Sequence, residues 1–337
     1  MIKFSVIIPV RKINEFLKEN ISYLKQLAYE NFEAIIITDE EEKFDFGDDR
    51  FLLISSGPIG PGEKRNLGAS KATGEVLAFL DDDAYPRSDW LDKAAELFSD
   101  PQVYAVGGPA VTPVNAKFME KMSGRVLESP LASAGTIYRH IPGKRVEIDD
   151  YPTVNLLVRK VDFDRVGGFS KEFWPGEDTK FCLDLVKSKG RKFIYDPSLV
   201  VFHHRRSLFI PHLKQISRYG RHRGQFARLF PETSRLPAYF APSSFLLGLL
   251  AGPVFCLFWP FLWQLYLGAL LFYLILLIWE GHKIYEKDWS MSGAFYVMAG
   301  IFLTHIVYGS NFIVGILKKP KLKLRGVDKS TGNYLGG

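Results

Sequence analysis

Three consecutive acids, Asp81, Asp82 and Asp83, directly follow the apolar run EVLAFL at 75–80. A short apolar run is typical of a buried strand, and ligands of open α/β sheets bind outside the carboxyl ends of the strands. Because alternate side chains of an extended backbone point the same way, we expect Asp81 and Asp83 to converge on one cation. Oxygen-rich sites suit Mg²⁺ or Mn²⁺, which substrate phosphates often share. The competing interpretation is a helix N-cap; a calcium loop is excluded because the glycine at its sixth position is missing.

The elements that would position these acids alternate along the first 110 residues. Apolar runs predict strands, and helical spacing of apolar residues predicts the helices between them. Such alternation argues for an α/β protein with a doubly wound, mostly parallel sheet. The expected strands cover 4–8, 33–38, 75–80, 103–106, 153–158, 194–195 and 199–202, and the expected helices cover 14–27, 64–72, 90–98, 179–187 and 208–230.

Two apolar blocks exclude a purely soluble protein. Residues 243–279 contain no Asp, Glu, Lys, Arg or His, and residues 293–317 contain only His305 of these types. Each block exceeds the ~20 residues that a helix needs to cross about 30 Å of hydrocarbon. The first is long enough for a hairpin of two helices that bends near Pro260. The expected spans are 243–262, 264–281 and 293–317.

Positive charge is concentrated on both sides of these blocks. The formal net charge is +6. Residues 201–235 contain eight Lys or Arg and one acidic residue, and residues 318–337 contain six Lys or Arg and one acidic residue. Such flanks are typical of segments at a cytosolic membrane surface, and no nucleic-acid partner is expected. Three crossings would place the two basic segments on opposite sides, which the positive-inside tendency disfavours. Either one block is re-entrant or the tendency is broken here.

Over most of residues 4–230 the sequence resembles the family-2 glycosyltransferases, which have the GT-A fold. The resemblance is carried by the opening strand SVIIP at 5–9, by KRNLG at 64–68 and by the three acids, which are similar to the D-x-D motif. It implies a GT-A catalytic domain over 1–207, with a nucleotide-sugar half at about 1–110 and an acceptor half at about 111–207. A basic amphipathic interfacial segment (208–242), a transmembrane region (243–317) and a basic, then flexible tail (318–337) would follow.

The resemblance also implies which residues bind the nucleotide-sugar. Asp39 falls where the family contacts the base, although TDEE at 38–41 lacks the usual second Asp and Gly. The resemblance therefore indicates where the nucleotide binds, but it indicates less clearly which nucleotide is bound. The full predicted set is Pro9, Val10, Arg11, Asp39, Lys64, Arg65, Asp81 and Asp82.

The implied ligands of a Mn²⁺ or Mg²⁺ cofactor are Asp81, Asp83 and His203. An imidazole beside two carboxylates is chemically reasonable for Mn²⁺. Adjacent residues of a strand face opposite ways, so at most one of His203 and His204 is expected to bind the metal. The alternative is that both histidines belong to an ordinary basic surface.

The acceptor side is implied by WPGED at 174–178 and by QISRY at 215–219, which is similar to the Q-x-x-R-W signature of membrane-bound members. A sugar hydroxyl needs a carboxylate within about 3 Å to take its proton. We expect Asp178 to be that base, with Glu177 orienting it or the acceptor, although both acids could instead cap the helix that follows. The residues predicted on the acceptor or membrane side are Trp174, Gln215, Arg218 and Tyr219.

Together these expectations describe an inverting, metal-dependent glycosyltransferase in a membrane, with its catalytic domain in the cytosol. The expected donor is a nucleotide-sugar, first of all a UDP-sugar, and the expected acceptor is a hydroxyl of a lipid-linked or polymeric glycan. Two alternatives stay open. One is a polyprenyl-phosphate glycosyltransferase, whose ionised acceptor needs no base, and the other is a non-catalytic membrane scaffold.

Overall fold

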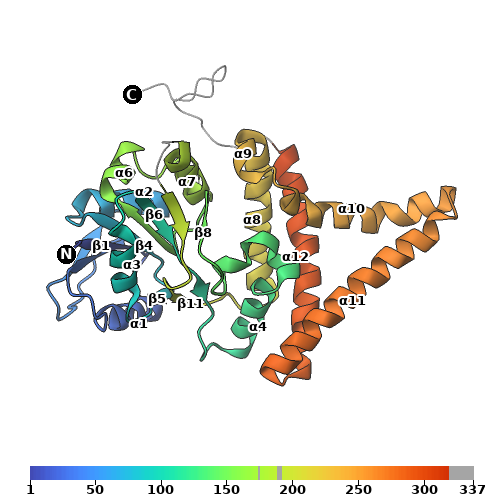
Figure 1. Cartoon of the computed structure of the whole chain (residues 1–337), viewed down its shortest axis with the longest axis horizontal. Coiled ribbons are helices and arrows are strands. Elements are labelled where there is room, and N and C mark those ends of the chain that lie inside the picture. Colours follow the sequence, from blue (N-terminus) through green and yellow to red (C-terminus); the bar gives the residue numbers. More distant parts are fainter. Residues whose placement is uncertain (174, 188–191, 319–337) are drawn as a thin grey trace, which may run out of the picture.

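The computed structural model describes residues 1–173, 175–187 and 192–318. It has an α/β part, a layer of helices beside it, and a long helical hairpin that points away from both (Figure 1). The predicted α/β class with a mostly parallel sheet, followed by three apolar helices, is confirmed.

The central sheet has eight strands in the order β3-β2-β1-β4-β9-β6-β10-β8. Neighbours run parallel from β3 to β4 and between β6 and β10, whereas β9 and β8 run antiparallel to their neighbours. The sequence pattern did not predict β3 or the antiparallel insertion of β9. The strands are β1 (Phe4–Pro9), β2 (Phe32–Thr38), β3 (Phe51–Ser55), β4 (Val76–Leu80), β6 (Val103–Gly107), β8 (Val146–Glu147), β9 (Asn155–Arg159) and β10 (Lys192–Tyr195).

A second, small sheet joins distant parts of the chain at the end of β4. It consists of β5 (Ala84–Pro86), β11 (Val201–His203) and β7 (Ala110–Val111), with β11 in the middle. β11 runs antiparallel to β5, and this register sets His203 opposite Ala84. Strand pairing thus brings a histidine from residue 203 next to the acids at 81–83.

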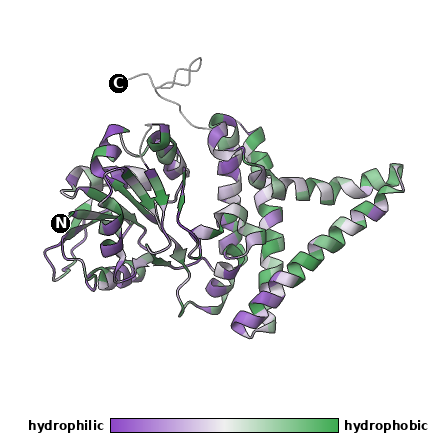
Figure 2. Ribbon diagram, in the orientation of Figure 1, coloured by the Kyte–Doolittle hydropathy of each residue, from purple (hydrophilic) through white to green (hydrophobic). Residues whose placement is uncertain are grey.

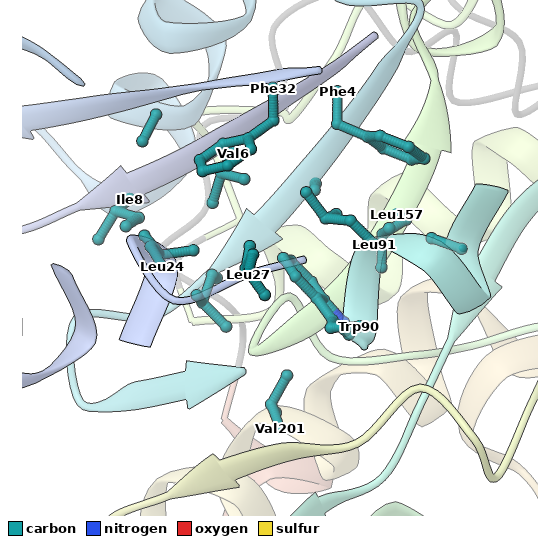
Figure 3. Close-up of a cluster of buried hydrophobic side chains, with 14 of the residues drawn as sticks. Phe4, Val6, Ile8, Leu24, Leu27, Phe32, Trp90, Leu91, Leu157 and Val201 are labelled. Atoms are coloured by element: carbon teal, nitrogen blue, oxygen red, sulfur yellow. The ribbon is translucent and has the colours of Figure 1, made fainter. Parts of the chain in front are cut away.

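Apolar side chains fill both faces of the central sheet. Figure 3 shows one of these clusters, in which Val6 and Ile8 of β1 lie with Leu24, Trp90 and Leu91 of the covering helices. Alternate residues of β1 belong to the opposite cluster, for example Ile7. Burial on both faces explains why the strands are continuous apolar runs.

Helices cover this sheet and form the layer beside it. The first seven are α1 (Glu15–Leu24), α2 (Pro61–Lys71), α3 (Trp90–Phe98), α4 (Phe118–Leu127), α5 (Pro130–Ser133), α6 (Lys160–Arg165) and α7 (Glu177–Lys187), and the turn η1 (Ala134–Arg139) follows α5. The remaining ones are α8 (Ile210–Leu229), α9 (Pro231–Ser234), α10 (Pro237–Phe258), α11 (Leu262–Asp288) and α12 (Met291–Leu317).

Three of these helices, α10, α11 and α12, are long and apolar enough to cross a membrane. α10 and α11 form the hairpin expected around Pro260. Figure 2 shows that the hairpin is mostly hydrophobic and that α11 becomes hydrophilic where it returns toward α4.

Candidate active site

The nucleotide side of the candidate site lies where β1 and β2 end. The backbone N–H of Val10 donates to the carbonyl of Ile37, which continues the pairing of the two strands beyond β1. Lys64, buried near the start of α2, pairs with the Asp39 carboxylate and donates to the Val10 carbonyl. A pocket of about 370 Å³ adjoins this pair and is lined by Arg11, Lys12, Asp39, Glu40 and Glu42. A separate pocket at the β8–β10 edge contains none of the predicted site residues.

The three acids occupy a tight turn between β4 and β5 instead of an extended segment. The N–H of Ala84 donates to the carbonyl of Asp81, which closes the turn at 3.1 Å. As a result each carboxylate has its own partner. Asp82 accepts from the amide of Asn14 at 2.7 Å, and burial raises its pKa to about 6.

Asp83 and His203 meet across the small sheet. The Asp83 Oδ1 atom lies 3.2 Å from His203 Nε2, and Arg206 lies 3.3 Å from the other oxygen. Although burial disfavours its charged form, the charges of His203 and Arg206 hold the pKa of Asp83 below its usual value. Arg205 donates to His203 Nδ1 at 3.0 Å, so the neutral imidazole carries its proton on Nε2, toward Asp83. His204 turns the other way, to Glu19 at 2.6 Å.

Arg65 connects the acid turn to the predicted acceptor side. Its guanidinium is buried and lies 2.8 Å from Asp81 and 3.2 Å from Glu177. The backbone of α2 comes close enough for this because residue 62 is glycine: a Cβ there would lie 3.2 Å from Cγ of Glu177. One cation thus fixes a carboxylate from each half of the site.

Asp178 directly follows Glu177, the last carboxylate of the ion pairs that Arg65 makes. It stands in the first turn of α7, where its Oδ1 accepts from the N–H of Thr179 at 2.7 Å. Burial, and next to it the charges of Glu177 and Asp150, raise the pKa of Asp178 well above its usual range. The helix N-terminus also suits a carboxylate here, so capping and a reactive role are compatible.

Helix α8 carries Gln215, Arg218 and Tyr219, which are predicted on the acceptor side. Gln215 donates to the Tyr219 hydroxyl at 3.1 Å. Tyr219 is 49% exposed, and desolvation of its hydroxyl together with the negative charges of Asp178 and Asp81 raises its pKa. Arg218 is exposed on the same helix, and Trp174 lies outside the described residues.

The pattern of the sequence gave no signal for a second charged cluster beneath Asp178. Asp150 lies 2.5 Å from Arg223 of α8 and 3.3 Å from Arg139. Although burial favours its neutral form, these two cations hold the pKa of Asp150 well below its usual value. The cluster ties α8 to the segment before β9, and Asp150 contributes to the raised pKa of Asp178.

Comparison with known families decides how this geometry is to be understood. Residues 5–167, which carry the acid turn and both residues of the Lys64-Arg65 pair, match the model of "Glycosyl transferase family 2". This part of the chain belongs to that family. The predicted membership is therefore confirmed.

Curated relatives are about 25% identical to this chain over the residues that align. A pre-mycofactocin glycosyltransferase of Mycobacterium tuberculosis is 25% identical over 232 residues, which are 64% of this chain and 46% of the relative. A glucosyl-dolichyl phosphate glucuronosyltransferase of Haloferax volcanii is 25% identical over 60% of this chain and 69% of the relative. The family-2 chain thus spans about half the length of the mycobacterial relative.

A solved structure shows the same fold over nearly the whole chain. A mannosyltransferase from Pyrobaculum calidifontis, in complex with GDP-Man and Mn²⁺, matches with a TM-score of 0.53 and 16% identity. The match covers 94% of this family-2 chain and 87% of the other. The predicted GT-A fold is confirmed.

The donor atoms of the acid turn fit a divalent cation in part. The Asp83 Oδ1 atom and the His203 Nε2 atom face each other, and a carboxylate beside an imidazole suits Mn²⁺ when phosphates supply further ligands. Because Arg205 donates to Nδ1, His203 would bind a cation through Nε2 only if its ring proton moved to Nδ1 and the Arg205 hydrogen bond broke. Asp81 does not join them, because Arg65 holds its carboxylate. Within the described residues no three ligating side chains lie together. The role of Asp81 as a metal ligand stays a prediction.

Proposed function

We propose that this family-2 chain is an inverting glycosyltransferase that moves a sugar from a nucleotide-sugar to a hydroxyl of a lipid-linked or polymeric glycan acceptor. The observation that carries the proposal is Asp178. It is a carboxylate of raised pKa, held beside the acid turn through Glu177 and Arg65. Among the described residues Asp178 is the one candidate base and no separate nucleophile is evident, which suits a single displacement that inverts the anomeric centre.

The donor would lie along the edge formed by the ends of β1, β2 and β4. Asp39 and Lys64 stand at the base-side pocket, and Arg206 is exposed next to Asp83. Fixed cations beside a leaving diphosphate lower the cost of its developing charge. UDP-sugars are the first donors to test.

Asp83 and His203 would hold a Mn²⁺ or Mg²⁺ ion. When bound, a divalent cation supplies positive charge to the diphosphate that departs. The hydrogen bond that Arg205 donates to His203 Nδ1 would have to break on metal binding, because a metal-bound imidazole carries its proton on the other ring nitrogen and donates from it. The Mn²⁺ in the archaeal mannosyltransferase supports this proposal.

Asp178 would remove the proton of the acceptor hydroxyl as the new bond forms. Its raised pKa makes it a stronger base than an ordinary aspartate. Tyr219 is an exposed aromatic side chain of α8 and can stack on a sugar face. Glu177, fixed by Arg65 and by the N–H of Gly176, orients the turn that carries Asp178.

A membrane location supports a lipid-linked acceptor. Three apolar helices follow the catalytic half, and the names of two relatives describe acceptors on dolichyl phosphate. The basic segments that flank the apolar helices favour the cytosolic side for the catalytic half.

A donor screen tests the proposal. The full-length protein in detergent would be given UDP-, GDP- and dTDP-sugars with and without Mn²⁺, and nucleoside diphosphate release would be measured. We expect one nucleotide class to be consumed, and chelation of the metal to stop the reaction. A protein that binds none of these donors in either condition, by calorimetry, would be a scaffold instead.

A further inference from the structure

We propose that α10 and α11 enter the bilayer as a hairpin, whereas α12 lies along the membrane surface beside α8. The last residues of α12 would then lie on the same side of the membrane as the catalytic half. The inference rests on the proposed membrane location. It resolves the conflict between three apolar helices and two basic flanks.

Helix α12 is lined from its start to its middle by segments of the catalytic half. Gly293 packs against Met122 of α4, and Gly300 packs against Val126 and Leu208. At mid-helix, His305 lies 3.0 Å from the carbonyl of Leu131 in α5. A helix whose middle sits at the bilayer centre could not contact these segments unless they were also inside the membrane.

The rest of α12 packs on α8 through glycines. A Cβ on Gly220 would lie 2.6 Å from the carbonyl of Tyr308, and one on Gly224 would lie 2.1 Å from that of Phe312. Near the ends of both helices, Arg228 donates to the carbonyl of Ile316 at 2.9 Å. The two helices therefore run side by side over the length of α8, as Figure 1 shows.

The charges of α8 argue against a crossing by this pair. Lys214, Arg218, Arg221 and Arg228 are exposed on one side of α8 and extend over about 21 Å at 1.5 Å per residue. If α12 crossed about 30 Å of hydrocarbon, its parallel neighbour would carry several of these cations into the bilayer. Such cations are costly and need an internal partner or a water-filled cavity.

Unlike α8, the hairpin of α10 and α11 has an apolar surface. α10 and α11 expose many large apolar side chains, for example Leu250, Phe258, Leu265 and Phe272. In α12 the exposed ones are Met291, Phe295 and Leu317, near its two ends. Lipid contact is thus available around most of the hairpin, whereas α12 packs against protein along one side and has fewer exposed apolar side chains.

Both ends of the hairpin return to the catalytic half. α10 starts three residues after α9, which is joined to α8 by a single residue. At the other end, Asp288 of α11 makes two hydrogen bonds to Arg125 of α4, at 2.8 and 2.9 Å. The hairpin can therefore cross the bilayer and return, and the basic segments before α10 and after α12 share one side. In this position the cations of α8 lie at the level of the lipid headgroups.

Cysteine labelling in sealed vesicles tests this topology with the full-length protein. The two native cysteines are free and buried, so the unmodified protein is the background control. The variants Glu96→Cys on the catalytic surface, Trp259→Cys at the hairpin tip and Lys318→Cys after α12 would be treated with a membrane-impermeant maleimide. Inside-out and right-side-out vesicles would be compared, with detergent-opened vesicles as the reference for full reaction.

We expect Glu96→Cys and Lys318→Cys to react from the same side, and Trp259→Cys not to react from that side. Reaction of Lys318→Cys only from the other side would show that α12 crosses and would overturn the inference while leaving the anchoring intact. Reaction of Trp259→Cys from the catalytic side would overturn the crossing of the hairpin. Release of the unmodified protein by alkaline carbonate would instead overturn the membrane location itself.

Discussion

Arg65 and Asp178 carry most of the chemistry that can be derived at the scale of single residues. Arg65 reaches a carboxylate from the acid turn and another from the acceptor-side motif, so its planar guanidinium fixes the distance between them. Within the described part of the chain Asp178 has no such ion pair, and burial together with the charges of Glu177 and Asp150 favours its neutral form. In the proposed mechanism Arg65 therefore positions the site, and Asp178 acts as the base.

Replacement of Arg65 by lysine tests the bridging role. An ammonium is a point charge that cannot hold Asp81 and Glu177 in the same fork geometry. We expect Arg65→Lys to lower kcat/KM by about tenfold to a hundredfold. The matched control is Arg50→Lys, which alters a surface pair with Asp48 and should leave activity unchanged. Equal activity of Arg65→Lys and the unmodified protein would remove the bridge from the account.

The raised pKa of Asp178 predicts a pH dependence. The base must be ionised, so kcat falls as the pH drops through its pKa. Since that pKa lies above the usual value of about 3.9 for aspartate, the decline should begin at higher pH than for an unperturbed carboxylate. The measurement is kcat at saturating donor and acceptor from about pH 5 to about pH 8. A flat profile over this range would contradict the assignment.

At the scale of elements, the sequence predicts those strands whose side chains are buried on both faces. β1, β2 and β4 are buried on both faces and therefore appear as apolar runs. β9 has the same appearance, but its antiparallel direction depends on pairing with β4 and β6, which no local pattern encodes. The same holds for the site: the acids could be found, whereas the turn that separates their side chains could not. The Asp150 cluster joins Asp150 to Arg223, which lies 73 positions further along the chain. No local sequence pattern predicts this pairing.

Close packing of α8 on α12 gives a prediction at this scale. In an isolated helix alanine is favoured over glycine by about 1 kcal/mol, but a Cβ on Gly224 would overlap the α12 backbone. We expect Gly224→Ala to lower the free energy of unfolding by about 1–3 kcal/mol, because the helices must separate. Thermal unfolding in detergent measures this. The control Gly248→Ala meets nothing within 4 Å, and equal stability of the two variants would contradict the packing.

At the scale of the whole molecule, the α/β part is joined to the apolar hairpin through a buried apolar cluster and a group of ion pairs. Arg125 of α4 pairs with Asp288 at the end of α11 and with Glu128, and Lys121 adds a further contact to Asp288 at 3.1 Å. These side chains are mostly buried, so their pairing is less screened than that of surface pairs. The cluster fixes where the hairpin returns to the catalytic half.

Arg125→Gln tests this attachment. The substitution leaves Asp288 and Glu128 without their main partner, and we expect the free energy of unfolding to fall by about 2–4 kcal/mol. Limited proteolysis near 289–290 should become faster because the end of α11 is released. Arg87→Gln, which removes a half-exposed pair with Asp89, is the control and should change stability by no more than about 0.5 kcal/mol. Equal effects of both variants would argue against the attachment.

The most direct test of the account is transfer by the Asp178→Asn variant. The amide keeps the size of the side chain but cannot accept the proton, so we expect kcat to fall by about 10²- to 10⁴-fold. Calorimetry should show unchanged binding of the donor with Mn²⁺, and Asp164→Asn on the exposed surface of α6 should retain full activity. Transfer by Asp178→Asn at the rate of the unmodified protein would contradict the central claim and favour an acceptor that is already ionised, such as a lipid phosphate.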